Sequence, residues 1–289
     1  MTLVEQVNAL LWGWAEMLRA LRRRVGAAPL LVYAAAQVAV LVSIVFFAYR
    51  PFSAFAAPAL AWRFGPQALH YPNNLFVLRA AVGQADLPLS VLLGPLTAGA
   101  AAVLFASLYA GRPERVGTAF RWAGAAYLPL LCVTALSVAL SQAAVRVPLA
   151  LWGHLADASP NRFRLVRLAT IAVVLALQAL LVYAVPGIAA ARLRLAEALA
   201  RSVRTALRQP VTTYLLVAVP AAFELLPAWL ARQGEAIALR LSPELLAAVM
   251  VLWIAVILAS SYAVIGTATR VFVHSAEDVV HGIADWKEV

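Results

Sequence analysis

The side chains able to do chemistry in this sequence are few, and the most notable is a carboxylate inside an apolar segment. Glu224 lies in the run AAFELLPAWL, near the outer end of a predicted membrane span. Ionisable groups are rare in membrane spans and often mark a substrate or ion pathway. Glu224 is therefore a candidate to bind a cation, a proton or a lipid headgroup. The interpretation we favour is structural: its carboxylate reaches the interface or pairs with an arginine such as Arg146 or Arg232.

Three glutamines in three different predicted spans, Gln37, Gln142 and Gln178, are the other intramembrane polar candidates. We expect them to hydrogen-bond between helices, which contributes about 0.6–2 kcal/mol each in membranes. The alternative is that they line a polar cavity together with Glu224. One further pattern predicts helix packing, because small residues that recur every four positions let backbones approach; its members are Ala98, Ala102, Ala106 and Ala110.

No set of residues in the sequence has the spacing of a catalytic or metal site. Cys132 is alone, so it forms no internal disulfide or cysteine-based metal site. Ser260 and Tyr262 have no accompanying histidine and acid, and phosphate-binding glycine motifs are absent. The four histidines, His70, His154, His274 and His281, lack ligand spacing. We expect no enzyme, no metal and no cofactor, and any active transport would need a separate ATPase.

The composition is that of a membrane protein. The chain has 289 residues, of which 64% are hydrophobic and 12% charged, against about 45–50% and about 25% in soluble domains. The net charge of +10 is carried by arginines at the ends of apolar runs. That placement is typical of topology signals rather than of a basic nucleic-acid-binding face, so we expect no nucleic acid.

The apolar segments predict an all-α, polytopic integral membrane protein forming a single membrane domain over residues 1–289. A span needs about 20 apolar residues, and about six segments qualify: 26–48, 88–110, 122–145, 166–190, 211–230 and 245–269. Residues 50–87 and 146–164 are read as outer loops, and residues 270–289 as a cytoplasmic tail. With six spans, the side that holds both termini carries more of the basic residues, which predicts cytoplasmic termini in a bacterial inner membrane.

One phrase, a basic helix followed by a proline and an apolar run, occurs twice. Ala15, Glu16, Leu18, Arg23, Pro29 and Tyr33 correspond to Ala196, Glu197, Leu199, Arg204, Pro210 and Tyr214. Residues 3–24 and 192–208 are accordingly read as two cytoplasmic interfacial amphipathic helices, each leading into a span. Whether the phrase reflects a true duplication stays open.

Arginines in the two lead-ins predict a belt that attracts anionic lipid headgroups at about 1 kcal/mol per residue. The belt residues are Arg22, Arg23, Arg24, Arg201, Arg204 and Arg208. The alternative, which we favour, is that they only determine topology.

Two segments carry family resemblances. In residues 88–140, the series Phe120, Arg121, Gly124, Ala126, Pro129, Leu130 and Leu131 resembles a helix of the Yip-type membrane proteins. Residues 184–214, with Glu197, Ser202 or Thr205, and Arg204, look like the six-helix membrane domain attached to some bacterial glycerophosphodiester phosphodiesterases. Both resemblances imply a bundle of about six helices without a known reaction centre.

These observations predict a non-catalytic membrane subunit or scaffold that packs against lipids and other integral membrane proteins. The alternative is a permease-like or lipid-handling transporter subunit that works with a separate ATPase. That alternative requires a polar cavity joining Glu224 to the glutamines. It also places an ATPase contact on residues 111–121 or 192–208.

Overall fold

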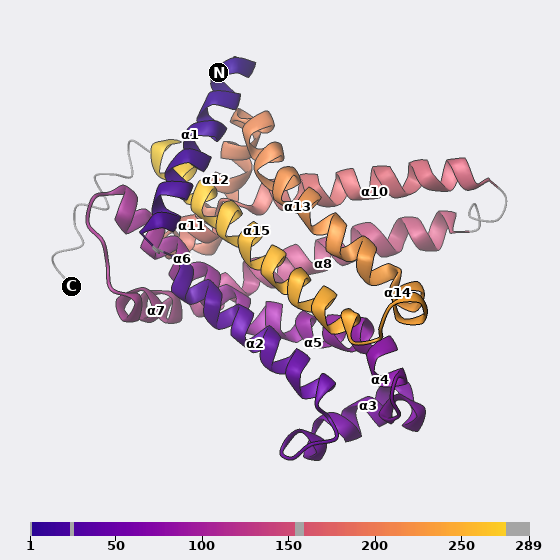
Figure 1. The fold of residues 1–289 in the computed structure, drawn as a ribbon. Coiled ribbons are helices and arrows are strands. Elements are labelled where there is room, and N and C mark those ends of the chain that lie inside the picture. Colours follow the sequence, from indigo (N-terminus) through magenta and orange to yellow (C-terminus); the bar gives the residue numbers. More distant parts are fainter. Residues whose placement is uncertain (1, 24–25, 154–158, 276–289) are drawn as a thin grey trace. The chain divides into compact units, whose positions relative to one another are not determined.

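The computed structural model describes residues 2–23, 26–153 and 159–275, and this part of the chain is helical with no strand. Figure 1 shows the helices in sequence colours. Their bounds are α1 Leu3–Arg22, α2 Ala27–Val45, η1 Phe52–Ala54, α3 Ala56–Phe64, η2 Pro66–Leu69, α4 Asn73–Phe76, α5 Leu78–Leu92, α6 Gly94–Tyr109, α7 Val116–Ala125, α8 Tyr127–Trp152, α10 Pro160–Leu181, α11 Ala184–Ala189, α12 Leu195–Arg208, α13 Pro210–Arg232, α14 Gly234–Arg240 and α15 Leu245–Ser275.

Within the described residues, five helices are long and apolar enough to cross a membrane: α2, α8, α10 together with α11, α13 and α15. A sixth candidate is the pair α5 and α6, which bends at the break between them and is either a broken span or a re-entrant segment. The chain is therefore a helical protein of multi-pass character, as its composition predicts.

Several elements begin or end elsewhere than the apolar runs suggest. The predicted loop 50–87 contains short helices and the first half of α5, so helix reaches ten residues before the predicted span at 88–110. The predicted third span divides into α7 and α8, and α15 continues beyond 269 to Ser275. The remainder of the predicted tail, residues 276–289, lies outside the described residues, as does Arg24.

The contacts between helices divide the chain into two compact units. Unit 1 comprises residues 1–29, 95–219 and 263–289, and unit 2 comprises residues 30–94 and 220–262. Helices α2, α13 and α15 contribute residues to both units.

Unit 1 is built around α6, which is buried on almost all sides. Every residue from Gly99 to Ser107 is buried, and a helix that is apolar all round belongs in an interior. Gly99 allows the closest approach, because an added Cβ would lie 2.6 Å from Leu130 Cδ1 and 3.3 Å from Ala123 Cβ. Helices α7, α8, α11 and α12 contribute the rest of this core.

Helix α1 packs one face against α13 and α15 in unit 1. Gln6, Leu10, Gly13, Met17 and Ala20 are its buried residues, spaced so that they fall on one side of the helix. The Val211 N–H donates to Gln6 Oε1 at 3.0 Å, and the Thr212 hydroxyl donates to the Gln6 carbonyl at 2.8 Å. The first bond satisfies a backbone N–H at the start of α13 that a helix leaves unpaired, and the second satisfies the buried Thr212 hydroxyl.

An ion pair joins the C-terminal half of α1 to α15. Arg270 of α15 pairs with Glu16, with Arg270 Nη2 donating to Glu16 Oε1 at 3.0 Å. Its guanidinium also lies 5.8 Å from the centre of the Tyr109 ring on α6.

The core of unit 2 is formed by one side each of α2, α5 and α15, with contributions from the short helices of residues 52–76. Leu41, Leu60, Leu78 and Met250 are among its buried side chains. The short helices therefore belong to the fold of this unit, although the sequence there predicts a loop of mixed apolar and polar residues.

We expect Gly13→Ala to destabilise the packing of α1 on α15. An added Cβ would lie 2.7 Å from Thr267 Cγ2, a buried β-branched side chain with little freedom to move. Overpacking of this kind costs about 1–3 kcal/mol. The measurement is thermal unfolding in detergent, where the variant should melt several degrees below the wild type.

Gly117→Ala on α7 is the matched control, because an added Cβ there meets nothing within 4 Å. It should be neutral or stabilise by up to about 1 kcal/mol through helix propensity. Equal melting temperatures for the two variants would mean that α1 does not pack on α15 as described.

Candidate functional site

A cavity of about 880 Å³ lies in unit 2, between α5, α13 and α15. Its position along the three helices is informative, because α13 ends at Arg232, α15 begins at Leu245, and Arg79 is the second residue of α5. The cavity therefore lies where the ends of two spans meet the start of α5. Ends of membrane helices lie at the level of the lipid headgroups.

The wall that α15 contributes is apolar. Leu246, Val249, Met250 and Trp253 line the cavity, and their spacing places them on one side of the helix. From Leu246 to Trp253 the helix rises about 10 Å. This wall thus leads from the end of the span toward its middle.

Two arginines supply the charge of the cavity. Arg79 is half-buried and Arg232 is exposed. Among the described side chains, no carboxylate lies within ion-pairing distance of either guanidinium. Gln84 also lines the cavity, and its side-chain oxygen accepts a hydrogen bond from Arg63 Nε at 3.1 Å. The described side chains therefore make the mouth of the cavity cationic.

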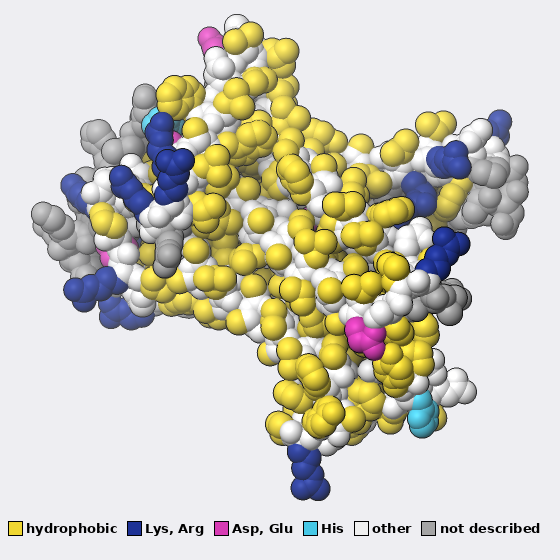
Figure 2. Space-filling model, viewed as in Figure 1, with side chains coloured by type: hydrophobic (Ala, Val, Ile, Leu, Met, Phe, Trp, Pro, Cys, Tyr) yellow, Lys and Arg dark blue, Asp and Glu magenta, His cyan; other side chains and the backbone are white. Residues whose placement is uncertain are grey.

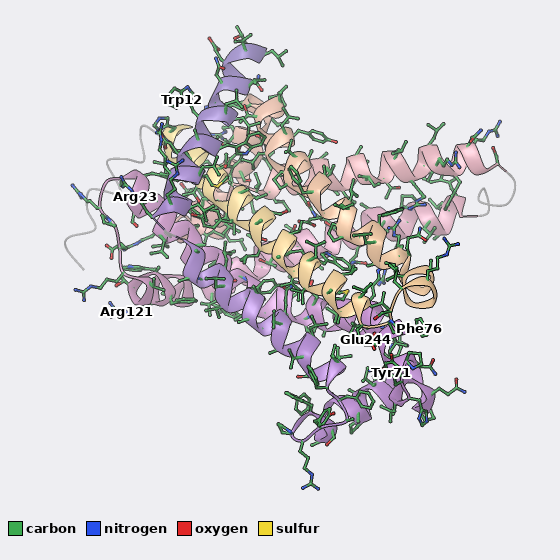
Figure 3. All side chains as sticks on the ribbon, in the orientation of Figure 1. Trp12, Arg23, Tyr71, Phe76, Arg121 and Glu244 are labelled. Atoms are coloured by element: carbon green, nitrogen blue, oxygen red, sulfur yellow. The ribbon has the colours of Figure 1, made fainter. Side chains whose placement is uncertain are left out.

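A hydrogen-bonded group beside the start of α15 links the helix to the segment before α5. The Tyr71 hydroxyl donates to Glu244 Oε1 at 2.6 Å, and the Ser242 hydroxyl donates to Glu244 Oε2. Figure 3 shows Tyr71, Phe76 and Glu244 at this end of unit 2. The bond from Ser242, and then the bond from Tyr71, lower the pKa of Glu244, and the same contact with Glu244 raises the pKa of Tyr71.

An acidic residue that the sequence analysis placed in a loop lies inside a helix. Asp86 is in α5, where Asp86 Oδ1 accepts hydrogen bonds from the Tyr33 hydroxyl at 2.8 Å and from Gln37 Nε2 at 2.6 Å. Both donors come from α2, which is a span candidate. The sequence contains a pattern that indicates a shared acceptor, since Tyr33 and Gln37 lie four residues apart on one face of α2. Reading residues 50–87 as a loop concealed it.

Glu224, the carboxylate singled out from the sequence, is half-buried on α13. The Ser260 hydroxyl of α15 lies near it and donates to the Pro220 carbonyl oxygen at 3.2 Å. Of the described histidines, His70 is the C-terminal cap residue of η2, and the ring of His274 contacts Arg270.

The three glutamines have different surroundings. Gln37 is buried and bound to Asp86, while its own oxygen has no partner among the described residues. Gln178 lines a small cavity of about 200 Å³ in unit 1. Gln142 is exposed on α8. Among the described residues, no hydrogen bond joins any two of these glutamines or joins one of them to Glu224.

The four alanines of the predicted packing stripe fall at different depths. Ala102 and Ala106 are fully buried, Ala98 is half-buried, and Ala110 is exposed just beyond the end of α6. Close packing along α6 involves nearly its whole circumference rather than one stripe.

The described arginines of the predicted belt are in unit 1 but do not form one compact cluster. Arg208 ends α12 next to the start of α13, which contacts Gln6 in the first turns of α1. Arg22 lies sixteen residues further along α1, about 24 Å away along its axis. Arg201 stacks on Phe272, with its guanidinium carbon 5.5 Å from the ring centre. Figure 3 shows Arg23 and Arg121 projecting outward from unit 1.

No group of three or more histidine, cysteine, aspartate or glutamate side chains suited to a metal ion occurs in the described part of the chain. No family model, curated protein or solved structure matches the sequence or the fold. The resemblances noted in the sequence therefore stay predictions.

We expect the contribution of Tyr71 to stability to depend on pH. Because the pKa of Glu244 is lowered in the folded protein, its stabilising contribution is present above its ordinary value of 4.5 and is lost as the pH falls through the lowered value. Tyr71→Phe removes one donor and brings that pKa back toward 4.5. The melting temperature of the variant should lie below that of the wild type at pH 7, and the difference should shrink by about pH 3.

Tyr49→Phe is the control, since Tyr49 is an exposed tyrosine of the same unit. Its effect should not change with pH. A Tyr71→Phe difference that is constant from pH 7 to pH 3 would contradict the hydrogen bond to Glu244.

Asp86→Ala should destabilise unit 2, because it leaves the Tyr33 hydroxyl and the Gln37 amide without an acceptor. Each unsatisfied buried donor costs about 1–3 kcal/mol. Adding Tyr33→Phe and Gln37→Leu removes these donors, so the triple variant should melt above Asp86→Ala alone. If the triple variant melts lower instead, the three side chains do not form a shared network.

Proposed function

We propose that the chain is a non-catalytic integral subunit or scaffold of the bacterial cytoplasmic membrane, with both termini in the cytoplasm. In this role it packs exposed spans against another membrane protein and the surrounding lipid. The observation that carries the proposal is an exposed amide side chain, Gln142, within α8, a helix long and apolar enough to span a membrane.

The helix concerned, α8, makes little use of its surface within the chain. In its most apolar stretch 11% of the residues are buried, compared with 33% in α2. Figure 1 shows α8 and α10 running side by side to the ends that flank residues 154–158. The side of α8 that faces away from α10 is left for lipid or for a partner.

That outer side has the composition of a helix interface rather than of a lipid-facing surface. Ala135, Ala139 and Ala143 recur every four residues and are exposed, and Gln142 and Arg146 are exposed on the same side. Small residues allow a second helix to approach closely, and a glutamine amide in hydrocarbon is stabilised by hydrogen bonds to such a neighbour. An exposed amide facing lipid would instead lose its hydrogen bonds.

The space-filling view is consistent with a molecule embedded in lipid. Figure 2 shows hydrophobic side chains covering most of the visible face, and the dark blue side chains, which are all arginines, gather near helix ends. Arginines at helix ends suit the interface and the topology proposed above.

The transporter alternative has less support. It requires Glu224 and the glutamines to share a cavity, and each of them has different neighbours. No observation on the described residues favours an ATPase contact.

The test is purification from the native membrane in a mild detergent, followed by mass spectrometry of whatever accompanies the chain. A stoichiometric membrane protein is expected with the wild type. Gln142→Leu and Ala139→Leu should each release it, because they remove the amide and fill the close-approach surface.

Ala172→Leu is the matched control, because Ala172 is an exposed alanine of the neighbouring helix α10. It should retain the partner. Recovery of the wild type without any protein partner, or equal retention by all three variants, would overturn the proposal. An ATPase among the partners would support the transporter instead.

A further inference from the structure

We propose that the cavity between α5, α13 and α15 binds one anionic phospholipid, with its phosphate held by Arg79 and Arg232 and an acyl chain along α15. This inference goes beyond the proposed function and does not depend on it, since it concerns unit 2 alone. The basis of this inference is the order of polarity in the cavity. Positive charge at the headgroup level is followed by apolar surface at the level of the acyl chains, which matches a phospholipid.

The cavity is charged at the helix ends and apolar along the span. Arg232 ends α13 and Arg79 lies in the first turn of α5, so both charges sit at helix ends. The apolar wall from Leu246 to Trp253 extends from that level along a span. A phospholipid places its phosphate at the headgroup level and its acyl chains in the hydrocarbon, which is the same order.

The cavity is large enough to hold a small molecule. A volume of about 880 Å³ lies within the range of about 300–1,000 Å³ that is usual for small-molecule sites. Gly83 on α5 keeps part of this space open, because an added Cβ would meet nothing within 4 Å. A side chain longer than that of glycine would occupy the cavity without a clash of its Cβ.

The charge at the mouth of the cavity suits a phosphate group. Two guanidinium groups without a carboxylate partner among the described residues make the mouth cationic. Guanidinium groups bind phosphate oxygens through paired N–H donors, and a half-buried arginine such as Arg79 gains most from such a counter-charge. Gln84 adds amide N–H donors, since its side-chain oxygen already accepts from Arg63.

The same lining predicts a preference among lipids. Among the described side chains that line the cavity there is no aspartate or glutamate. A zwitterionic headgroup would bring an ammonium group close to two arginines, and that repulsion disfavours it. A headgroup with net negative charge, as in phosphatidylglycerol, has no such penalty.

The experiment measures lipid binding to the purified full chain by native mass spectrometry. Phosphatidylglycerol and phosphatidylcholine of equal chain length are titrated separately, and glycerol phosphate serves as a free headgroup. We expect phosphatidylglycerol to bind at least about tenfold more tightly than phosphatidylcholine, because two charge-assisted contacts distinguish them. Glycerol phosphate should bind far more weakly, since it lacks the acyl chain.

Two independent variants test the two halves of the site. Gly83→Leu fills the apolar part and should weaken binding of both lipids at least about tenfold. The double variant Arg79→Gln and Arg232→Gln should remove the preference for phosphatidylglycerol while leaving weak binding of both lipids. Unchanged melting temperatures in lipid-free detergent establish that each variant is folded.

Matched controls separate the cavity from the rest of the surface. Gly117→Leu places the same side chain at an open helical glycine of α7, and Arg240→Gln removes an exposed arginine of α14 that does not line the cavity. Both should bind phosphatidylglycerol as the wild type does.

The proposal is overturned if Gly83→Leu and the double arginine variant bind phosphatidylglycerol as tightly as the wild type, because the lipid would then lie elsewhere, for example on the arginines of unit 1. It is also overturned if glycerol phosphate binds as tightly as the lipid, which would indicate a site for free phosphate. Loss of binding in Gly117→Leu or Arg240→Gln to the same extent would show that the effects are not specific to the cavity.

Discussion

Burial of α6 on nearly every side is the packing constraint on which unit 1 depends. Its run of glycine and alanine lets neighbouring helices approach the backbone, as the contact between Gly99 and Leu130 shows. Phe105 on the same helix fills the space beside Gly26, whose φ of +74° and lack of a side chain allow the turn from α1 into α2. Substituting larger residues in α6 would therefore displace several helices together, since close-packed interiors transmit strain.

Polar contacts in this protein satisfy groups that the membrane cannot hydrate. Gln6 accepts hydrogen bonds from the Val211 N–H and the Thr212 hydroxyl at the start of α13, and Asp86 accepts from Tyr33 and Gln37. In hydrocarbon an unpaired polar group costs several kcal/mol, so each such group selects a neighbouring helix that can pair with it. Of the three glutamines predicted to lie in spans, Gln142 is the one with an exposed side chain, and for that reason it carries the proposal of an external partner.

The distribution of arginines separates two roles that look alike in the sequence. The arginines of α12 and of the end of α1 lie on the surface of unit 1, as residues that determine topology do. Arg79 and Arg232 instead line a cavity that continues into apolar surface. The difference lies in what surrounds each guanidinium group, and spacing along the chain does not reveal it. A lipid bound there would contact all three helices that line the cavity and so stabilise unit 2.

The sequence by itself determined that the chain is helical and multi-pass, because long apolar runs have no other way to satisfy their backbone in a bilayer. It also indicated where surface helices lead into spans: Pro210 is the first residue of α13, and Pro29 lies in the first turn of α2. Tertiary structure alone decided that residues 78–87 are helical, that Asp86 meets α2, and that Arg79 and Arg232 share a cavity. Those facts depend on contacts between segments more than forty residues apart, and hydropathy along the chain carries no information about which distant segments pair.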